Sequence, residues 1–323
     1  MNTKQQIAAL LERSEKEYLS GSAIAETLGL TRAAVWKCVK QLEAEGYDIE
    51  STKRGYRLGV KNDALSEGLV KKYLGVLADK ISLEVLGSVD STNTYLKGKA
   101  AETSSWHAAV ASQQTAGRGR MGRSFESPAN TGVYLSILVR PDLPAQEALK
   151  LTTAAAVAAC LAIEECTDSK ARIKWVNDVY VNGRKTCGIL TEASIDLESG
   201  GLDWAVMGIG FNVYEPEGGF PEEIRNIAGP ITAERARDLR SRISASFLKH
   251  YYDIVEAGGL DGFAEEYKRR SFIIGERVNV LRGGTSRSAR ALDIDEECRL
   301  IVEYEDGSRE ALSSGEVSIR PVK

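Results

Sequence analysis

The chain has 323 residues, 43% of them hydrophobic and 27% charged, and its net charge is −4; this is an ordinary globular composition in which any contact with nucleic acid must come from a local basic patch. Five cysteines without C-x-x-C pairs and only two histidines disfavour a metal site, a disulfide framework and a Ser-His-Asp triad. The N-terminus lacks a signal-peptide core, and the longest apolar stretch, 154–163, is too short for a bilayer, so we expect a cytoplasmic protein without membrane contact.

Residues 4 to 58 have the pattern of three short helices followed by a hairpin. Ser20 and Thr31 are N-cap candidates for helices at 23–28 and about 32–45, and Gly29 provides the turn between them. A basic hairpin follows these helices in the sequence, and the combination predicts a winged helix-turn-helix that binds DNA. The alternative is a small helical domain that contacts other proteins. The residues predicted to contact DNA are Arg32, Trp36, Lys37 and Lys40 on the third helix and Lys53, Arg54 and Arg57 in the wing.

A second domain is expected after a polar stretch, 60–69, that has the composition of a linker. A strand over 81–86 is followed by Asp90-Ser91-Thr92-Asn93, where Ser91 or Thr92 would cap a new helix. A helix N-terminus lined by hydroxyls and an amide can hold a polar or anionic group, although such residues more often only cap the helix.

The most unusual segment is 113–123, between predicted strands at 106–112 and 133–139, in which three glycines alternate with three arginines. It matches G-x-G-x-x-G, but a turn-forming stretch with Pro128 follows instead of a helix, so we reject a dinucleotide-binding fingerprint. Glycine backbone and guanidinium groups suit an anion. From these residues alone, an anion-binding loop and a flexible basic loop without a ligand are equally plausible.

A buried helix is predicted over about 145–166, followed by hairpin strands that turn at Asn177-Asp178 and Asn182-Gly183. A further strand over 204–213 contains Gly208 and Gly210, which would either admit a ligand to the sheet surface or mark a bulge. From residue 275 onward, short strands at 277–280, 289–294, 300–304 and 309–312 predict a small barrel. Its turns are expected at Gly283-Gly284, Glu296-Glu297 and Asp306-Gly307.

With these pieces in place, the whole chain resembles the bifunctional biotin–protein ligases, also called biotin operon repressors. The motifs that carry the resemblance, in chain order, are Asp90-Ser91-Thr92-Asn93, Gly117-Arg118-Gly119-Arg120-x-Gly122-Arg123, Lys174-Trp175-x-Asn177-Asp178, Lys185-x-x-Gly188-Ile189-Leu190 and Gly208-Ile209-Gly210-x-Asn212. Phe125, Val176 and Cys187 depart from the commoner family pattern of Trp, Pro and Ala. The resemblance implies an α+β multidomain fold. Its parts would be a winged helix-turn-helix (1–62), a central mixed-sheet α/β ligase domain that binds biotin and ATP (63–270) and a C-terminal SH3-like β-barrel (271–323).

The resemblance also implies the chemistry. Biotin's carboxylate would attack the α-phosphate of ATP-Mg²⁺ to give biotinyl-5′-AMP, and a lysine of a biotin carboxyl carrier protein or domain would then attack this adenylate. Arg118, Arg120 and Lys185 would neutralise phosphate charge, and Asp178 would orient or deprotonate the acceptor lysine. The residues expected to bind biotin or adenylate are Ser91, Thr92, Asn93, Gln114, Gly117, Arg118, Gly119, Arg120, Phe125, Lys185, Gly188, Gly208 and Asn212.

Regulation follows from the same resemblance. The bound adenylate would act as corepressor by promoting a homodimer that presents two winged helices to operator DNA. We further hypothesise that the three arginines of 115–125 repel one another without an anion and that the loop folds around the adenylate. Three alternative functions remain: a lipoate–protein ligase, a transcription regulator without catalytic activity, and a protein whose N-terminal winged helix-turn-helix (the head) binds no DNA. The alternative to the catalytic roles of Lys185 and Asp178 is that both are exposed charges at hairpin ends without a partner.

Overall fold

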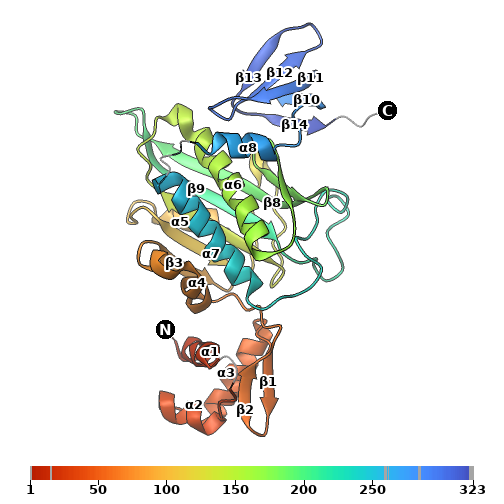
Figure 1. Ribbon diagram of the computed structural model, residues 1–323. Helices are drawn as coiled ribbons and strands as arrows, with labels where there is room; N and C mark the ends of the chain where they lie inside the picture. The colour runs from red at the N-terminus through yellow and green to blue at the C-terminus, as the bar shows by residue number, and fades with distance from the viewer. Residues whose placement is uncertain (1, 15–16, 258–259, 261, 283–284, 320–323) are drawn as a thin grey trace.

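The computed structural model describes residues 2–14, 17–257, 260, 262–282 and 285–319. The described chain forms three units in a row, with the helical head at one end and a small antiparallel sheet at the other (Figure 1). The turn predicted at Gly283-Gly284 lies outside the described residues, whereas the turns at Glu296-Glu297 and Asp306-Gly307 are confirmed.

The head is a winged helix-turn-helix. Its elements are α1 (Thr3–Arg13), α2 (Gly21–Leu28), α3 (Arg32–Ala44), β1 (Ile49–Thr52) and β2 (Gly55–Leu58). The Ser20 hydroxyl accepts a hydrogen bond from the Ala23 amide, and Thr31 does the same for Ala34, so both predicted N-caps are confirmed. Gly29 ends α2 in the left-handed region at φ 65°. The three helices bury a core of their own, which includes Ile7, Leu11, Ile24, Val35 and Val39.

Part of the stretch expected to be a linker is buried, since residues 62–65 are buried whereas Val60 and Lys61 are exposed. Asn62 and Asp63 are both buried, and the Asp63 carboxylate accepts hydrogen bonds from the Arg240 amide (2.9 Å) and the Tyr214 hydroxyl (2.7 Å). The guanidinium of Arg240 lies against the same carboxylate, with Nε 3.3 Å from Oδ2. Polar composition does not reveal this burial, because the Asp63 carboxylate finds its partners on Tyr214 and Arg240, far along the chain.

The central unit is built on a mixed sheet whose described strands run in the order β3-β4-β5-β9-β8-β7-β6, with only β3 and β4 parallel. Its strands are β3 (Ser82–Leu86), β4 (His107–Ala111), β5 (Gly132–Val139), β6 (Ala171–Lys174), β7 (Asp178–Val181), β8 (Arg184–Ile195) and β9 (Leu202–Asn212). Its α-helices are α4 (Glu67–Leu74), α5 (Thr92–Lys99), α6 (Ala148–Cys166), α7 (Leu239–Tyr252) and α8 (Ala264–Arg270). Short helical turns lie at η1 (Gly75–Asp79), η2 (Arg120–Gly122), η3 (Ala145–Glu147) and η4 (Asp253–Ala257).

The two faces of this sheet have different roles because successive side chains on a strand point to opposite sides. On β9, Met207, Ile209 and Phe211 belong to the large core beneath α6 and α7, which cover one face (Figure 1). The intervening Gly208 and Gly210 therefore lie on the opposite face, where α5 packs against β4, β5 and β9. The alternation of residues along β9 thus separates an apolar face of the sheet, covered by α6 and α7, from a face that is open to a ligand.

The C-terminal unit is an antiparallel sheet of the described strands β10 (Arg277–Arg282), β11 (Thr285–Ile294), β12 (Leu300–Tyr304), β13 (Arg309–Leu312) and β14 (Glu316–Ile319). Their order is β13-β12-β11-β10-β14, and the last strand was missed in the sequence. The unit matches the predicted SH3-like type, although the described strands do not close into a complete barrel. Its core is continuous with that of the central unit, and the indole Nε1 of Trp175 donates to the Cys298 carbonyl at 3.0 Å.

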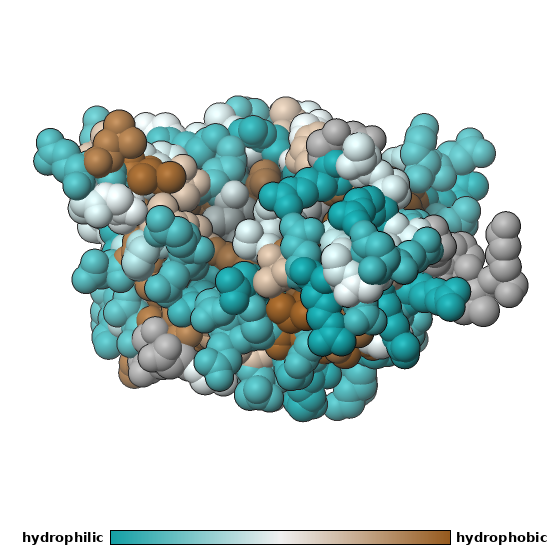
Figure 2. All heavy atoms as spheres, turned by 90° about the horizontal axis from the view of Figure 1, so that it is seen from above, coloured by the Kyte–Doolittle hydropathy of each residue, from teal (hydrophilic) through white to brown (hydrophobic). Residues whose placement is uncertain are grey.

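Seen from the C-terminal end, the surface is mostly hydrophilic, with hydrophobic residues in separate patches (Figure 2). Large hydrophobic side chains with high exposure include Met121 in the glycine–arginine loop and Ile195 and Leu197 at the β8–β9 turn. Within the described residues, no helix has the length and apolarity needed to cross a bilayer. We retain the domain boundaries 1–62, 63–270 and 271–323 as a proposal.

Candidate active site

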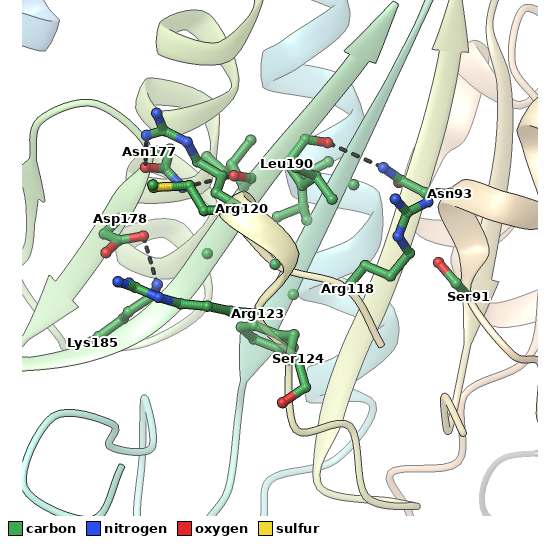
Figure 3. Close-up of a pocket in the computed structure, with 18 of the residues that line it drawn as sticks. Ser91, Asn93, Arg118, Arg120, Arg123, Ser124, Asn177, Asp178, Lys185 and Leu190 are labelled. Atoms are coloured by element: carbon green, nitrogen blue, oxygen red, sulfur yellow. Dashed lines mark hydrogen bonds and ion pairs between the residues drawn. The ribbon is translucent and has the colours of Figure 1, made fainter. Parts of the chain in front are cut away.

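A cavity of about 140 Å³ lies on the α5 side of the central sheet, between the glycine–arginine loop, β7, β8 and β9. Figure 3 shows that its labelled side chains come from the α5 N-terminus, the loop and the β6–β8 hairpins. Of the residues predicted to bind ligand or act in catalysis, the structure brings together Ser91, Thr92, Asn93, Gln114, Arg118, Gly119, Arg120, Phe125, Asp178, Lys185, Gly188 and Gly208. Gly117 and Asn212 do not line the cavity. A Cβ on Gly117 would overlap the Phe125 carbonyl, so this glycine permits close packing of the loop on itself.

The α5 N-terminus is held in place by side-chain hydrogen bonds. Ser91 is its N-cap, and its hydroxyl accepts from the Thr94 amide. Gln114 Oε1 accepts from both the amide (2.9 Å) and the hydroxyl (3.1 Å) of Thr92, and Ser136 Oγ donates to Thr92 Oγ1 at 2.7 Å. The loop before the glycines is therefore fastened to the helix terminus, which fixes the polar wall of the cavity.

Asn93 is buried, and its amide is fully engaged within the protein. Its Nδ2 donates to the Leu190 carbonyl (3.2 Å) and to Glu192 Oε2 (2.9 Å), while its Oδ1 accepts from Ser136 Oγ (2.6 Å). A Cβ on Gly208 would overlap this amide. Gly208 therefore makes room for Asn93, and Asn93 braces the sheet behind the cavity.

The glycine–arginine loop is compact, and Arg118 and Arg120 each have a partner of their own. Arg120 Nη1 donates to Asn177 Oδ1 (2.8 Å) and its Nη2 to the Gly315 carbonyl (2.9 Å), while Arg118 Nη1 lies 3.2 Å from Glu192 Oε1. Protein acceptors thus separate the guanidinium groups of Arg118 and Arg120, which offsets the repulsion expected between these two. The η2 turn lies within the motif and ends at Gly122, and no helix opens at this third glycine, which confirms the rejection of a dinucleotide-binding fingerprint.

Two predicted catalytic residues face each other across the β7–β8 hairpin. Lys185 Nζ lies 2.7 Å from Asp178 Oδ1, and both side chains are largely buried (Figure 3). They come together because Asn182-Gly183 turns the chain between β7 and β8, as predicted, with Asn182 and Gly183 both at positive φ. The alternative of exposed hairpin charges without a partner is thus wrong.

An aromatic ring lies over a glycine platform on the sheet. Gly188 on β8 and Gly210 on β9 are directly paired, and a Cβ on either would crowd or overlap the ring of Phe125. The β5–β9 register runs without interruption past Gly208 and Gly210, so the bulge interpretation of these glycines is wrong. The platform instead admits an aromatic side chain to the sheet surface.

Sequence reasoning missed Glu192, Ser136 and the backbone of Gly315. Gly188, Leu190 and Glu192 are alternate residues of β8 and therefore lie on the same face of the strand. This alternation could have identified Glu192 as a residue on the cavity side of the sheet. Burial opposes its ionisation, but hydrogen bonds from Lys97 and Asn93 outweigh this effect and lower the pKa of its carboxyl group. Gly315 reaches the cavity only because the C-terminal sheet packs beside it, which no local pattern reveals.

The thiols of Cys160 and Cys187 are buried. Burial raises the pKa of Cys160 to about 12 and that of Cys187 well above its usual value, so both remain protonated at neutral pH. A protonated thiol is a poor nucleophile and a poor metal ligand. Within the part of the chain that the structure describes, no group of three or more His, Cys, Asp and Glu residues could hold a metal ion.

In the head, a groove runs between α3 and the wing. It is lined by Arg32, Trp36 and Lys40 from the helix and by Lys53 from the hairpin, and Trp36 is 56% exposed. Lys37 and Arg54 are exposed beside it. Arg57 differs, because its Nη2 lies 2.5 Å from Glu50 and its guanidinium stacks over Tyr18. It therefore stabilises the wing from within.

Comparisons with known proteins agree with this arrangement. Family models match at residues 85–212 (biotin/lipoate A/B protein ligase family), 3–57 (HTH domain) and 273–320 (biotin protein ligase C terminal domain). The chain is 33% identical to the bifunctional ligase/repressor BirA of Bacillus subtilis, over 96% of this chain and 97% of that protein. It is 30% identical to BirA of Escherichia coli, over 94% of both. The biotin protein ligase from Aquifex aeolicus, solved in complex with biotin and ATP, superposes with a TM-score of 0.61 at 28% identity, covering 75% of this chain and 99% of that one.

Proposed function

The chain belongs to the bifunctional ligase/repressor family of biotin–protein ligases, and we propose how its own residues perform the reactions. It adenylates biotin with ATP and transfers the biotinyl group to a carrier-protein lysine, and it acts as a biotinyl-adenylate-dependent repressor. The observation that carries the site assignment is the convergence of Arg118, Arg120 and Lys185 on one cavity.

In the first half-reaction, a carboxylate oxygen of biotin bonds to the α-phosphorus of ATP, and pyrophosphate leaves. Negative charge concentrates on the phosphate oxygens, so preorganised cations supply most of the stabilisation. Arg120 is the best preorganised of the three, because Asn177 and Gly315 fix both of its terminal nitrogens. Mg²⁺ would enter with ATP and help to neutralise the negative charge on the phosphate oxygens.

The ligand would be held between the polar wall and the glycine platform. The hydroxyls of Ser91 and Thr92 and the amide of Gln114 line the cavity where biotin's polar ring would bind. The aromatic face of Phe125 would stack on adenine beside Gly188 and Gly210. A cavity of about 140 Å³ is well below the roughly 300 Å³ or more of typical ligand pockets, so the loop would open to admit both substrates.

In the second half-reaction, the acceptor lysine attacks the biotinyl carbonyl carbon and AMP leaves. The lysine must lose a proton before or during attack, and Asp178 is the carboxylate at the cavity wall that can accept it. Asp178 is paired with Lys185 in this structure, so its release would follow transfer of Lys185 to the phosphate.

For repression, we propose that adenylate-bound chains form a homodimer that places two heads on operator DNA. The exposed Met121 in the loop, and Ile195 and Leu197 at the β8–β9 turn, supply apolar area that a partner subunit would cover. The groove between α3 and the wing would face the DNA, with Arg32 and Trp36 at base edges and the lysines at phosphates. We place the protein in the cytoplasm, where ATP, DNA and the acceptor carboxylase meet.

The ligase function is tested by incubating the chain with a purified biotin carrier domain, ATP, Mg²⁺ and either biotin or lipoate. We expect the mass of the carrier to rise by one biotinyl group at a single lysine with biotin and to stay unchanged with lipoate. Modification by lipoate alone would assign the chain to the other branch of its family.

A further inference from the structure

We propose that Glu192 is a positioning residue that holds Arg118 in the geometry seen here and yields it to the negative charge of the substrate, and that Lys97 sets how firmly Glu192 holds Arg118. The inference rests on the proposed role of Arg118 in binding the adenylate. Neither Glu192 nor Lys97 lines the cavity, so both would act through Arg118 and not on the ligand itself.

The Glu192 carboxylate gathers donors from two other segments of the chain. Oε2 accepts from Nδ2 of Asn93 at 2.9 Å. Oε1 is shared by Lys97 Nζ at 2.6 Å and Arg118 Nη1 at 3.2 Å. The β8 strand thus links the second turn of α5 to the first arginine of the loop.

The exposures indicate which of these contacts gives way. The side chains of Glu192 and Lys97 are 21% and 28% exposed, whereas that of Arg118 is 49% exposed and makes the longer contact. The Glu192–Lys97 pair is therefore the permanent one, and Arg118 is the mobile partner.

Charge balance explains why Lys97 matters. When Arg118 moves to a phosphate or carboxylate, Glu192 keeps one cation and one hydrogen bond, so no unpaired buried charge remains. Without Lys97, Arg118 would be the only cation on that carboxylate. Its departure would then leave Glu192 uncompensated, and the ligand would have to compete for Arg118 against a stronger hold.

The test is a double-mutant cycle read by equilibrium affinity for biotinyl-5′-AMP, titrated into the full chain by calorimetry without acceptor. Lys97→Met should weaken binding by about two- to fivefold, as expected for partly exposed ion pairs. Lys97→Arg, which keeps the charge, should restore wild-type affinity. In a Glu192→Gln background, Lys97→Met should have no effect, because the competing carboxylate is gone.

A matched control is present on the same helix. Lys99 Nζ lies 2.7 Å from Glu84 Oε1, and neither residue lines the cavity. Lys99→Met should therefore leave adenylate affinity unchanged. A second readout is the rate of tryptic cleavage after Arg118 in the ligand-free chain, which should rise in Glu192→Gln and fall in Lys97→Met. This readout also tests the proposal if Glu192→Gln folds poorly, because Lys97→Met and Lys97→Arg must still differ.

Equal weakening by Lys97→Met in both backgrounds would overturn the inference, since Lys97 would then act without Glu192. Unchanged affinity and cleavage in every variant would overturn it as well. Carrier biotinylation by the wild-type chain tests the proposed function separately. If the wild-type chain biotinylates the carrier while Lys97→Met weakens adenylate binding equally in both backgrounds, this inference is rejected and the proposed function stands.

Discussion

Lys185 Nζ lies 2.7 Å from Asp178 Oδ1, so the cation proposed to bind phosphate and the carboxylate proposed to serve the acceptor lysine form an ion pair with each other. Lys185 occupies the Asp178 carboxylate, which would become available to the acceptor lysine once Lys185 turns to the phosphate. We propose that this exchange couples the two half-reactions.

Substitution of these two residues should separate the half-reactions. Lys185→Ala should slow adenylate formation by about 10²-fold or more, the size of effect seen for single electrostatic stabilisers. Asp178→Ala should affect adenylation less than transfer to the acceptor. Rapid-quench measurements of each half-reaction distinguish these outcomes, with Arg172→Ala, an exposed cation on β6 that does not line the cavity, as control. Wild-type transfer rates in both active-site variants would refute the role assignment.

The loop between Arg118 and Arg123 should be a ligand-dependent trypsin target. Met121 within it is 74% exposed, and under the proposed function the loop would open to admit the substrates. We expect cleavage in the free chain and protection by saturating biotin with ATP, while cleavage after Lys53 in the wing serves as an internal reference. Equal loop cleavage with and without ligand would remove the loop from the regulatory mechanism.

Head residues should differ in how they affect DNA binding. Lys37 is exposed on α3, so Lys37→Ala should reduce the slope of log affinity against log salt by about 1, as expected for loss of one phosphate contact. Lys71→Ala, on α4 outside the head, is the control and should leave the slope unchanged. Arg57 is engaged by Glu50, and Arg57→Ala should change the slope less than Lys37→Ala. Fluorescence anisotropy with a labelled duplex gives the slopes, and identical slopes for the Lys37 and Lys71 variants would reject the interface.

The buried pair of Asp63 and Arg240 should be a major stability determinant at the junction of head and central unit. Asp63→Asn leaves the Arg240 guanidinium buried without its counter-charge, and we expect a loss of about 3–5 kcal/mol in the free energy of unfolding. The double variant Asp63→Leu with Arg240→Met removes both charges and should lose less. Urea unfolding measures both, and a double variant less stable than Asp63→Asn would contradict this account.

Local sequence signals predicted the head and the strands well, because caps and turns act within a few residues. Ser20, Thr31 and Asn182-Gly183 each specify a boundary through their own hydrogen bonds or backbone conformation. The face carrying the cavity also follows from residue alternation, since Gly208 and Gly210 fall between the buried Met207, Ile209 and Phe211.

The contacts that connect distant segments were not predictable from local pattern. Glu192, the buried Asp63 and the Gly315 carbonyl acquire their roles from partners many residues away, at Lys97, Arg240 and Arg120. Asn93 was correctly placed at the cavity, but its engagement with Leu190 and Glu192 depends on the β8 register. The ordered motifs of the family resemblance predicted which residues gather at the cavity, but not which of them have hydrogen-bond partners within the protein.

The most direct test of the central claim is native mass spectrometry of the full chain after incubation with ATP, Mg²⁺ and either biotin or lipoate, without acceptor. The account predicts a complex whose added mass equals biotinyl-5′-AMP in the biotin sample, its absence with lipoate, and its loss in Lys185→Ala. A chain that binds biotin but never carries the adenylate, or one that carries only lipoyl-AMP, would contradict it.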